Sequence, residues 1–517
     1  MKRTILPLGL ALALCASLAG AAAASLFDSS SDTGYPDNGK AIELLKPASD
    51  YADILAYRPR ALSIIRARDN GFVPSPELHT YLRGVLLRVL AGVTLPATFQ
   101  PDVRVLASPE FEAFCTPDGT VVVSVGLLEK LDNEDELAFV LGHEASHAIY
   151  RHHGSDWFDR SQYYAVMSGA AVDKMSEQQP SLASSAGFNK SEFERGLDLA
   201  QHVYKLSSNV LVPQFKKGQE DAADALGFDL MAKAGYSSDA ANAVLDDIAQ
   251  QEAEAESDVA AAKAAEKDGG GSKQNKFAVD LFGSNGLPDL STLNVATLFT
   301  WDKMIKLFDD AVDSMSGEAT THHPAKVREK LLSDYEFREY RHLLPKPPKP
   351  LPWSGSPTLK AAVLLAHYAK AETAWAALSG SQPDLAKAQK PMLLAVSAPT
   401  ADHAYTEYVA SLYYEQSRSQ AQSEAALARA VSGPEPSWQV YARLANLYIA
   451  RREWPKAQAL MDQALTRFDN SPVLLPKRIQ ILHGAGRQAE AEALLPQCDQ
   501  YDIHELSDEC KKAAGKS

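Results

Sequence analysis

Residues 137–153 read Leu-Ala-Phe-Val-Leu-Gly-His-Glu-Ala-Ser-His-Ala-Ile-Tyr-Arg-His-His, and they contain an HExxH motif formed by His143, Glu144 and His147. Residues four apart on a helix lie on one face, one above the other. A helix would therefore place the two imidazoles where one zinc ion can bridge them, and Glu144 could reach a zinc-bound water. The stretch predicts a zinc site in the middle of a helix.

The alternative is a chance match, in which the histidines only cover a helix surface. The flanking sequence argues against it, because apolar residues recur at helical spacing: Leu137, Val140, Leu141 and Ala148. Asn133, with Glu136 three residues later, is typical of a helix N-cap. The motif then lies well inside a helix, where its spacing has chemical meaning.

The length and composition are those of a globular protein with more than one domain. The chain has 517 residues, of which 45% are hydrophobic and 23% are charged, enough for two or three domains with a large core. Its net charge of −15 argues against nucleic acid and anionic membrane surfaces as partners.

The N-terminus has the pattern of a signal peptide over residues 1–24. Lys2 and Arg3 precede an apolar stretch, and small residues lead up to a cleavage site after Ala24. Cys15 offers the alternative of a lipoprotein, but a large residue precedes it where a lipobox has a small one. No later stretch is long and apolar enough for a transmembrane anchor. We therefore expect an exported protein, most simply in a bacterial periplasm.

The chain up to the motif predicts helices and a small sheet. Helices are expected at residues 61–68, 77–90 and from 126, strands at 103–107 and 121–125, and an edge strand at 111–115. Residues 252–276 are rich in Ala, Glu, Lys and Gly and predict a flexible insertion. Six prolines within residues 345–357 predict a stiff, extended linker and a domain boundary.

Residues 358–517 are expected to be helical, with a repeat near 34 residues. The best copy matches the small and large core positions of a tetratricopeptide repeat at Leu444, Ala445, Tyr448, Ala457, Met461 and Ala464. A helical bundle without repeats remains the alternative. Cys498 and Cys510 in this part could form a disulfide in an exported protein, and Cys115 would then be an unpaired, buried thiol.

A catalytic zinc needs a third protein ligand, which the HExxH motif does not supply. Glu220 and Asp224 would share a helix face, so one could bind the metal while the other orients a histidine. An acidic pair at this spacing is by itself more typical of a charged surface, and the residues alone leave the question open.

Four segments together resemble one zinc metallopeptidase family, which includes HtpX and the CAAX prenyl protease. They are the run 111–128, similar to NAF-x-x-P-x-G followed by GLL; the NEDELA lead-in at 133–138; ExxxD followed by Gly and Ala-Gly-Tyr at 220–236; and Thr-His-His-Pro at 321–324. The resemblance covers roughly residues 50–340. The signal peptide and C-terminal repeats make the layout most similar to the BepA-like periplasmic members.

The resemblance implies a role for each site residue. His143, His147 and Glu220 would bind one Zn²⁺ per chain, Glu144 would be the general base, and Asp224 would be the supporting acid. The chain departs from the family pattern at four positions: Glu112 replaces an asparagine, Ala222 a glutamate and Gln219 an arginine, and Arg328 is displaced by one position.

The expected fold class is α+β and mostly helical, with a gluzincin-type metallopeptidase domain over 25–344 followed by tetratricopeptide-like repeats over 358–517. The resemblance implies a periplasmic zinc endopeptidase that degrades misfolded or stalled envelope and outer-membrane proteins, with the repeats docking a client or the assembly machinery. The alternative is a chaperone or scaffold of envelope assembly with little proteolysis. His323 is a candidate fourth ligand that would close the metal site, and the alternative is that it and His322 are surface loop residues.

Overall fold

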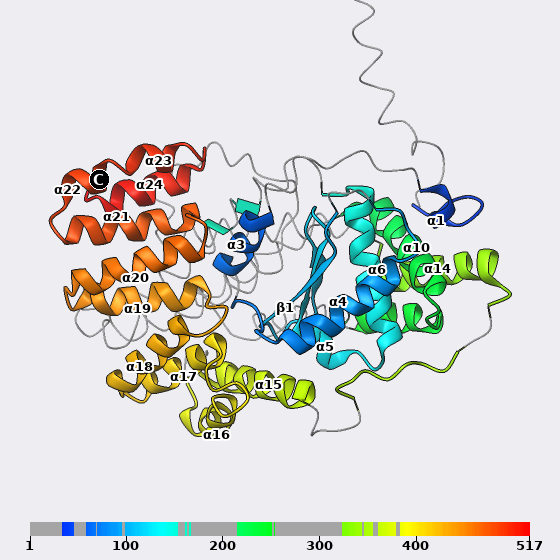
Figure 1. The fold of residues 1–517 in the computed structure, drawn as a ribbon, viewed down its shortest axis with the longest axis horizontal. Helices are drawn as coiled ribbons and strands as arrows, with labels where there is room; N and C mark the ends of the chain where they lie inside the picture. Colours follow the sequence, from blue (N-terminus) through cyan, green and yellow to red (C-terminus); the bar gives the residue numbers. More distant parts are fainter. Residues whose placement is uncertain are drawn as a thin grey trace, which may run out of the picture.

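The computed structural model describes residues 34–45, 58–68, 70–95, 99–153, 215–250, 323–343, 346–354, 360–378 and 383–516, with short pieces at 161–162, 165–166 and 253. Figure 1 shows the described chain as two parts, a sheet with helices around it and a block of paired helices, with the helix α3 (Arg58–Arg68) between them. The expected signal peptide and nearly all of the insertion at 252–276 lie outside the described residues.

A three-stranded sheet forms where the valine-rich runs predict strands. The strands are β1 (Asp102–Leu106), β2 (Ala113–Cys115) and β3 (Thr120–Ser124). Their order is β1-β3-β2, with β1 parallel and β2 antiparallel to the central strand. Every residue of β3 is buried, as expected for a central strand rich in β-branched residues. β2 is an edge strand among the described residues, as the sequence predicts.

In the described part of the chain, helices pack on this sheet and on one another. They are α4 (Pro76–Leu90), α5 (Val125–Lys130), α6 (Glu134–Tyr150), α10 (Lys217–Lys233) and α14 (Ala325–Tyr340). The HExxH helix α6 begins where predicted, because the Asn133 side chain accepts a hydrogen bond of 3.0 Å from the Glu136 backbone N–H. This contact satisfies one of the free donors at the helix start.

Helices α6 and α10 cross at glycines. A Cβ on Gly227 of α10 would lie 2.8 Å from the backbone nitrogen of His143 on α6, closer than real Cβ contacts allow. Gly227 therefore lets the two helix backbones approach closely, which brings side chains of α10 within reach of the HExxH residues.

The described part of the proline-rich segment, residues 346–354, packs against the HExxH helix. The Lys349 carbonyl accepts a 2.7 Å hydrogen bond from the Glu134 backbone N–H, and the Lys349 N–H donates to buried Asp135. Leu351 is buried, and the Trp353 indole N–H donates to the Leu128 carbonyl. This stretch thus covers the N-terminus of α6 as well as connecting the two parts.

The C-terminal part is a series of helix pairs: α15 (Lys360–Leu378), α16 (Leu385–Ala395), α17 (Ala404–Gln416), α18 (Gln420–Ser432), α19 (Trp438–Ala450), α20 (Trp454–Arg467), α21 (Leu475–Gly484), α22 (Gln488–Glu492), α23 (Leu495–Asp499) and α24 (His504–Ala513). The starts of α18, α20 and α22 are 34 residues apart. The turns ahead of them have positive φ at Arg418, Arg452 and Gly486, which repeat at the same interval. The sequence-derived period is therefore present in the structure.

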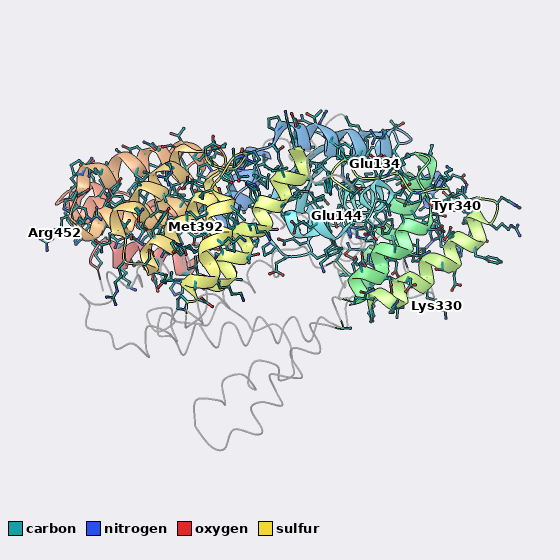
Figure 2. All side chains as sticks on the ribbon, turned by 90° about the horizontal axis from the view of Figure 1, so that it is seen from below. Glu134, Glu144, Lys330, Tyr340, Met392 and Arg452 are labelled. Atoms are coloured by element: carbon teal, nitrogen blue, oxygen red, sulfur yellow. A yellow bond between two sulfur atoms is a disulfide. The ribbon has the colours of Figure 1, made fainter. Side chains whose placement is uncertain are left out.

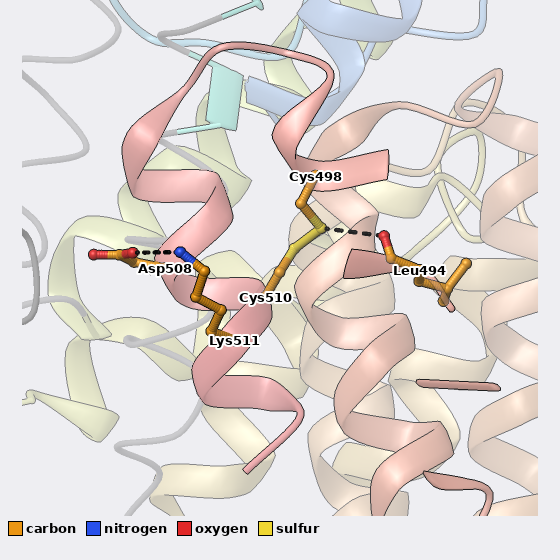
Figure 3. Close-up of a disulfide and its surroundings, with 5 residues drawn as sticks. All are labelled: Leu494, Cys498, Asp508, Cys510 and Lys511. Carbon is orange, nitrogen blue, oxygen red and sulfur yellow. Dashed lines mark hydrogen bonds and ion pairs between the residues drawn. A yellow bond between two sulfur atoms is a disulfide. The ribbon is translucent and has the colours of Figure 1, made fainter. Parts of the chain in front are cut away.

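A disulfide between Cys498 and Cys510 joins α23 to α24 (Figure 3). The pairing agrees with the sequence-based suggestion. Cys115 is a free and buried thiol, also as expected. The disulfide ties the last described helix to the helix pair before it.

The two parts of the chain meet through specific contacts. The Arg66 guanidinium on α3 donates to both oxygens of Glu435, at 2.7 and 3.3 Å, in the loop before α19. Helices α15 and α5 also pack together, and one continuous set of buried apolar residues runs through both parts. Among the described residues, no helix is both long and apolar enough to span a membrane.

Candidate metal centre

Three side chains from two helices converge on one point. His143 and His147 come from successive turns of α6, and Glu220 comes from the first turn of α10. The two Nε2 atoms are 3.1 Å apart, and each lies 3.6 Å from a Glu220 carboxylate oxygen. In the part of the chain that the structure describes, these are the residues whose ligand atoms form a group able to hold a metal ion. Figure 2 labels Glu144 of the same motif among the helices of this part.

The chemistry of these donors fits a divalent cation. All three side chains are buried. Two imidazole nitrogens and a carboxylate that face one another are all hydrogen-bond acceptors when the rings are neutral, so a cation between them would satisfy their lone pairs. Burial lowers the pKa of His147 well below its usual value, and the neighbouring His143 lowers it further, so the ring is in the neutral form that binds metals. Two imidazoles and one carboxylate are a ligand set of catalytic zinc sites with one position open.

Asp224 sets the orientation of His143. One carboxylate oxygen of Asp224 lies 2.9 Å from His143 Nδ1, which leaves Nε2 facing the metal position. Burial by itself would raise the pKa of Asp224, but Arg328 and His143 lower it to about 2. Asp224 is therefore an anion that faces the Nδ1 side of His143, as carboxylates behind metal-binding histidines do. This is the place that the family resemblance implies for it.

Arg328 pairs with two of the acidic residues of α10, Asp224 and Glu220. Its guanidinium binds Asp224 through two hydrogen bonds of 2.8 and 2.7 Å, and its Nη1 lies 3.1 Å from Glu220. Burial would lower the pKa of Arg328, but Asp224 and Glu220 raise it above its usual value. The sequence analysis identifies Arg328 only as the displaced counterpart of a family arginine and assigns it no role. No local sequence pattern could indicate its role, because its partners lie about a hundred residues away in the chain.

The His147 imidazole is held in place by His152 and Phe215. Arg151 ends α6 in the left-handed conformation with φ of 58°, and this turn brings His152 back beside the helix. His152 Nδ1 lies 2.9 Å from His147 Nδ1, and the Phe215 ring stacks on His147 with 3.7 Å between centroids. Burial, His153 and His143 lower the pKa of His152 to about 3, so it can accept the His147 Nδ1–H. Sequence reasoning missed both His152 and Phe215.

Glu144 is placed to move protons. It is partly buried and follows His143 directly, and it is not one of the three grouped ligands. Burial raises the pKa of Glu144, His143 lowers it and Glu220 raises it, giving a value of about 7. A carboxylate with this pKa can both accept and release a proton near neutral pH.

The structure places His323 next to a different acid. Its Nδ1 lies 3.1 Å from both carboxylate oxygens of Asp221, which is buried on α10. His323 is thus not part of the group formed by the three ligands, and His322 lies outside the described residues. The role of His323 as a fourth ligand remains a prediction.

Replacing Glu220 with Ala should weaken zinc binding by two orders of magnitude or more, because two imidazoles alone would remain as ligands. The measurement is zinc content after dialysis together with competition against a chromogenic chelator. Full zinc occupancy in Glu220→Ala would show that the third ligand lies elsewhere.

The comparisons with known proteins agree with this chemistry. Residues 76–332 match peptidase family M48, a segment that contains all three ligands, Glu144, Asp224 and Arg328. The mitochondrial metalloendopeptidase OMA1 of Arabidopsis thaliana is 29% identical over 135 residues, covering 26% of this chain and 23% of the relative. The protein of the same name from Schizosaccharomyces pombe is 29% identical over 164 residues, covering 31% and 41%.

A third relative, the mitochondrial metalloendopeptidase OMA1 of Bos taurus, is 42% identical over 50 residues, which is 10% of each chain. The chain thus aligns with less than half the length of each of these relatives. Residues 76–332 therefore carry the signature of peptidase family M48, and the ligand geometry within them supports a metallopeptidase of that family.

Proposed function

We propose that this chain is a zinc-dependent endopeptidase that hydrolyses extended segments of unfolded polypeptides. The observation that carries the proposal is the convergence of His143, His147 and Glu220 beside Glu144, a carboxylate that is not a ligand. One bound Zn²⁺ at this site would polarise the scissile carbonyl and acidify the attacking water.

The residues of the chain divide the remaining work. Glu144 accepts the proton of the attacking water and delivers it to the leaving amine. Asp224 and His152 each hold the Nδ1 of one imidazole, so the ligand nitrogens stay directed at the metal position. Arg328 keeps Asp224 ionised and keeps the Glu220 carboxylate in place.

The edge strand β2 favours an extended substrate. It pairs with β3 on one side only among the described strands, and it packs against α6. A peptide can therefore add to it as a further strand through backbone hydrogen bonds, a mode of recognition that depends little on sequence. Unfolded chains offer such segments and folded domains generally do not.

We place the enzyme in an oxidising, exported compartment, the periplasm. Two observations support this location: the signal-peptide pattern of residues 1–24 and the Cys498–Cys510 disulfide, since disulfides persist mainly outside the cytosol. The printed names of the relatives describe mitochondrial enzymes, so the location is a property proposed for this chain. The substrates proposed with it are misfolded or stalled envelope and outer-membrane proteins.

We further assign the helix pairs of α17–α22 to tetratricopeptide repeats that dock a client or the outer-membrane assembly machinery. The 34-residue spacing of their helices supports this assignment. The second candidate function is a chaperone or scaffold with little proteolysis. The large size of the C-terminal helical part favours it.

The experiment that tests the proposed function compares cells producing the wild-type chain with cells producing Glu144→Gln. Envelope fractions are isolated, and the proteins bound to each chain are identified by mass spectrometry. We expect outer-membrane proteins to accumulate full-length on Glu144→Gln only. Equal binding and equal amounts in both would overturn the substrate class, and cytoplasmic recovery with reduced Cys498 and Cys510 would overturn the location.

His323→Ala should raise basal casein hydrolysis if His323 closes the open metal position in the resting enzyme, because four protein ligands exclude the reacting water. Asp221→Asn is the matched variant, since it removes the anion that holds the His323 ring. It should lower hydrolysis by releasing the ring toward the metal. Unchanged or lower activity in His323→Ala would remove the closing role.

The contacts of the proline-rich segment predict where the repeats can be removed. A chain ending at Ser354 should still cut casein and should lose its physiological client. A chain ending at Leu344 should also be less stable by at least about 2 kcal/mol, because it loses the burial of Leu351 and the cover over α6. Denaturant unfolding of both truncated chains distinguishes these cases, and equal stability would show that the segment is only a connection.

A further inference from the structure

The segment 34–45, here called the N-terminal strap, lies directly on the helix that carries Glu220. The backbone N–H of Gly34 donates a 3.3 Å hydrogen bond to Asp221, the residue next to this ligand. A Cβ at position 34 would lie 1.8 Å from the Gly218 carbonyl oxygen and 2.9 Å from the Ala222 nitrogen. The strap and the first turn of α10 are therefore in backbone-to-backbone contact at the ligand.

The other end of the strap is fixed to the same helix two turns further on. The Ile42 N–H donates to Asp229 at 2.8 Å, and the Ala41 N–H donates at 2.8 Å to the Tyr335 hydroxyl. Tyr335 in turn donates to Asp229. The strap thus contacts α10 at two points, one at the turn that carries Glu220 and one at Asp229, beyond the supporting Asp224.

Tyr35 lies between these two points and reaches the charged cluster behind the ligands. Its side chain is buried, its ring centroid is 5.4 Å from that of Tyr335, and its hydroxyl makes no hydrogen bond within the described residues. Burial raises the pKa of Tyr35, Asp224 and Asp221 raise it further, and Arg328 lowers it. All three charged groups are therefore close enough to affect the ionisation of this buried phenol.

We propose that the N-terminal strap is a positioning element of the metal centre. Docked on α10, it fixes the first helical turn and thereby the Glu220 carboxylate, while Tyr35 keeps water away from the Arg328–Asp224 pair. The inference rests on the proposed metallopeptidase function, because it concerns the same ligands. It adds that an N-terminal segment remote from the HExxH motif decides how tightly the metal is held.

The test measures zinc affinity of the purified full chain by competition with a chelator, so it does not depend on hydrolysis. Gly34→Ala forces the strap away from α10, and adding Ile42→Pro removes the second backbone donor. We expect a 10- to 100-fold loss of zinc affinity, the size seen when groups behind metal ligands are removed. Hydrogen exchange of residues 34–45 in the same samples shows that the strap is released.

Two further variants separate positioning from general destabilisation. Gly433→Ala is the matched control, because its Cβ would meet the Asp402 carbonyl oxygen at 2.3 Å in the helical part. It should lower the unfolding temperature and leave zinc affinity within twofold of wild type. Tyr35→Ser should lose affinity, and Tyr35→Phe should restore it, since the hydroxyl has no hydrogen-bond partner among the described residues.

Wild-type affinity in the double variant with a released strap would overturn the inference and leave the metal centre intact. An equal loss in Gly433→Ala would also overturn it. If the wild-type chain itself bound no zinc, the proposed function would fail first, so the two failures are distinguishable.

Discussion

Glu144→Gln should lower peptide-bond hydrolysis by about 10²–10⁴-fold, the usual contribution of general-base catalysis, while zinc content and stability stay at wild-type values. Glu144 is not one of the three grouped ligands, and its environment raises its pKa to about 7. The amide has the same shape and cannot accept the proton of water. Only the proton transfer is therefore removed.

The measurement is the initial rate of casein cleavage at equal zinc occupancy. Glu492→Gln, which changes a partly exposed carboxylate of the helical part, is the matched control and should cut like wild type. The Glu144→Gln chain should still bind clients and accumulate complexes with them. If it corrected every defect of cells that lack the chain, the protein would act as a scaffold and the protease assignment would be wrong.

Arg328→Met should produce the second large effect, a loss of both stability and zinc affinity. The Arg328 side chain is only 12% exposed and pairs with Asp224 and Glu220, so its removal leaves two largely buried acidic groups side by side. Breaking a buried ion pair by removing one partner destabilises a protein by about 3–5 kcal/mol. Asp224 would also lose the partner that keeps it ionised toward His143, so the ligand would be less well held.

Denaturant unfolding and chelator competition measure the two losses separately. Arg443→Met is the matched control, because Arg443 is a buried arginine paired with Glu415 in the helical part. It should lower stability and leave zinc affinity unchanged. Equal zinc affinity in both variants would show that Arg328 has a structural role only.

Local sequence patterns predict several elements of the fold. The N-cap at Asn133, the valine-rich strands and the 34-residue spacing each depend on neighbours in the chain, and the structure has helices, strands and turns at these positions. The HExxH spacing likewise places His143 and His147 on one helix face. Glu220 could be identified from the order of the family segments, because acidic pairs on helices are otherwise common.

The groups behind the ligands could not be predicted in this way. Arg328 contacts Asp224, and the Gly34 N–H contacts Asp221, from segments about 100 and 190 residues away in the chain, and no local spacing encodes such contacts. The prolines of 345–357 predict an extended backbone, but they do not indicate which surface it covers. His152 depends on the left-handed turn at Arg151, a conformation that arginine does not signal.

The most direct test of the metallopeptidase assignment is casein cleavage by the purified chain as its zinc is removed and restored. The assignment predicts one zinc per chain, loss of cleavage when a chelator removes it, and recovery when about one equivalent is added back. Undiminished cleavage by the metal-free chain would contradict it.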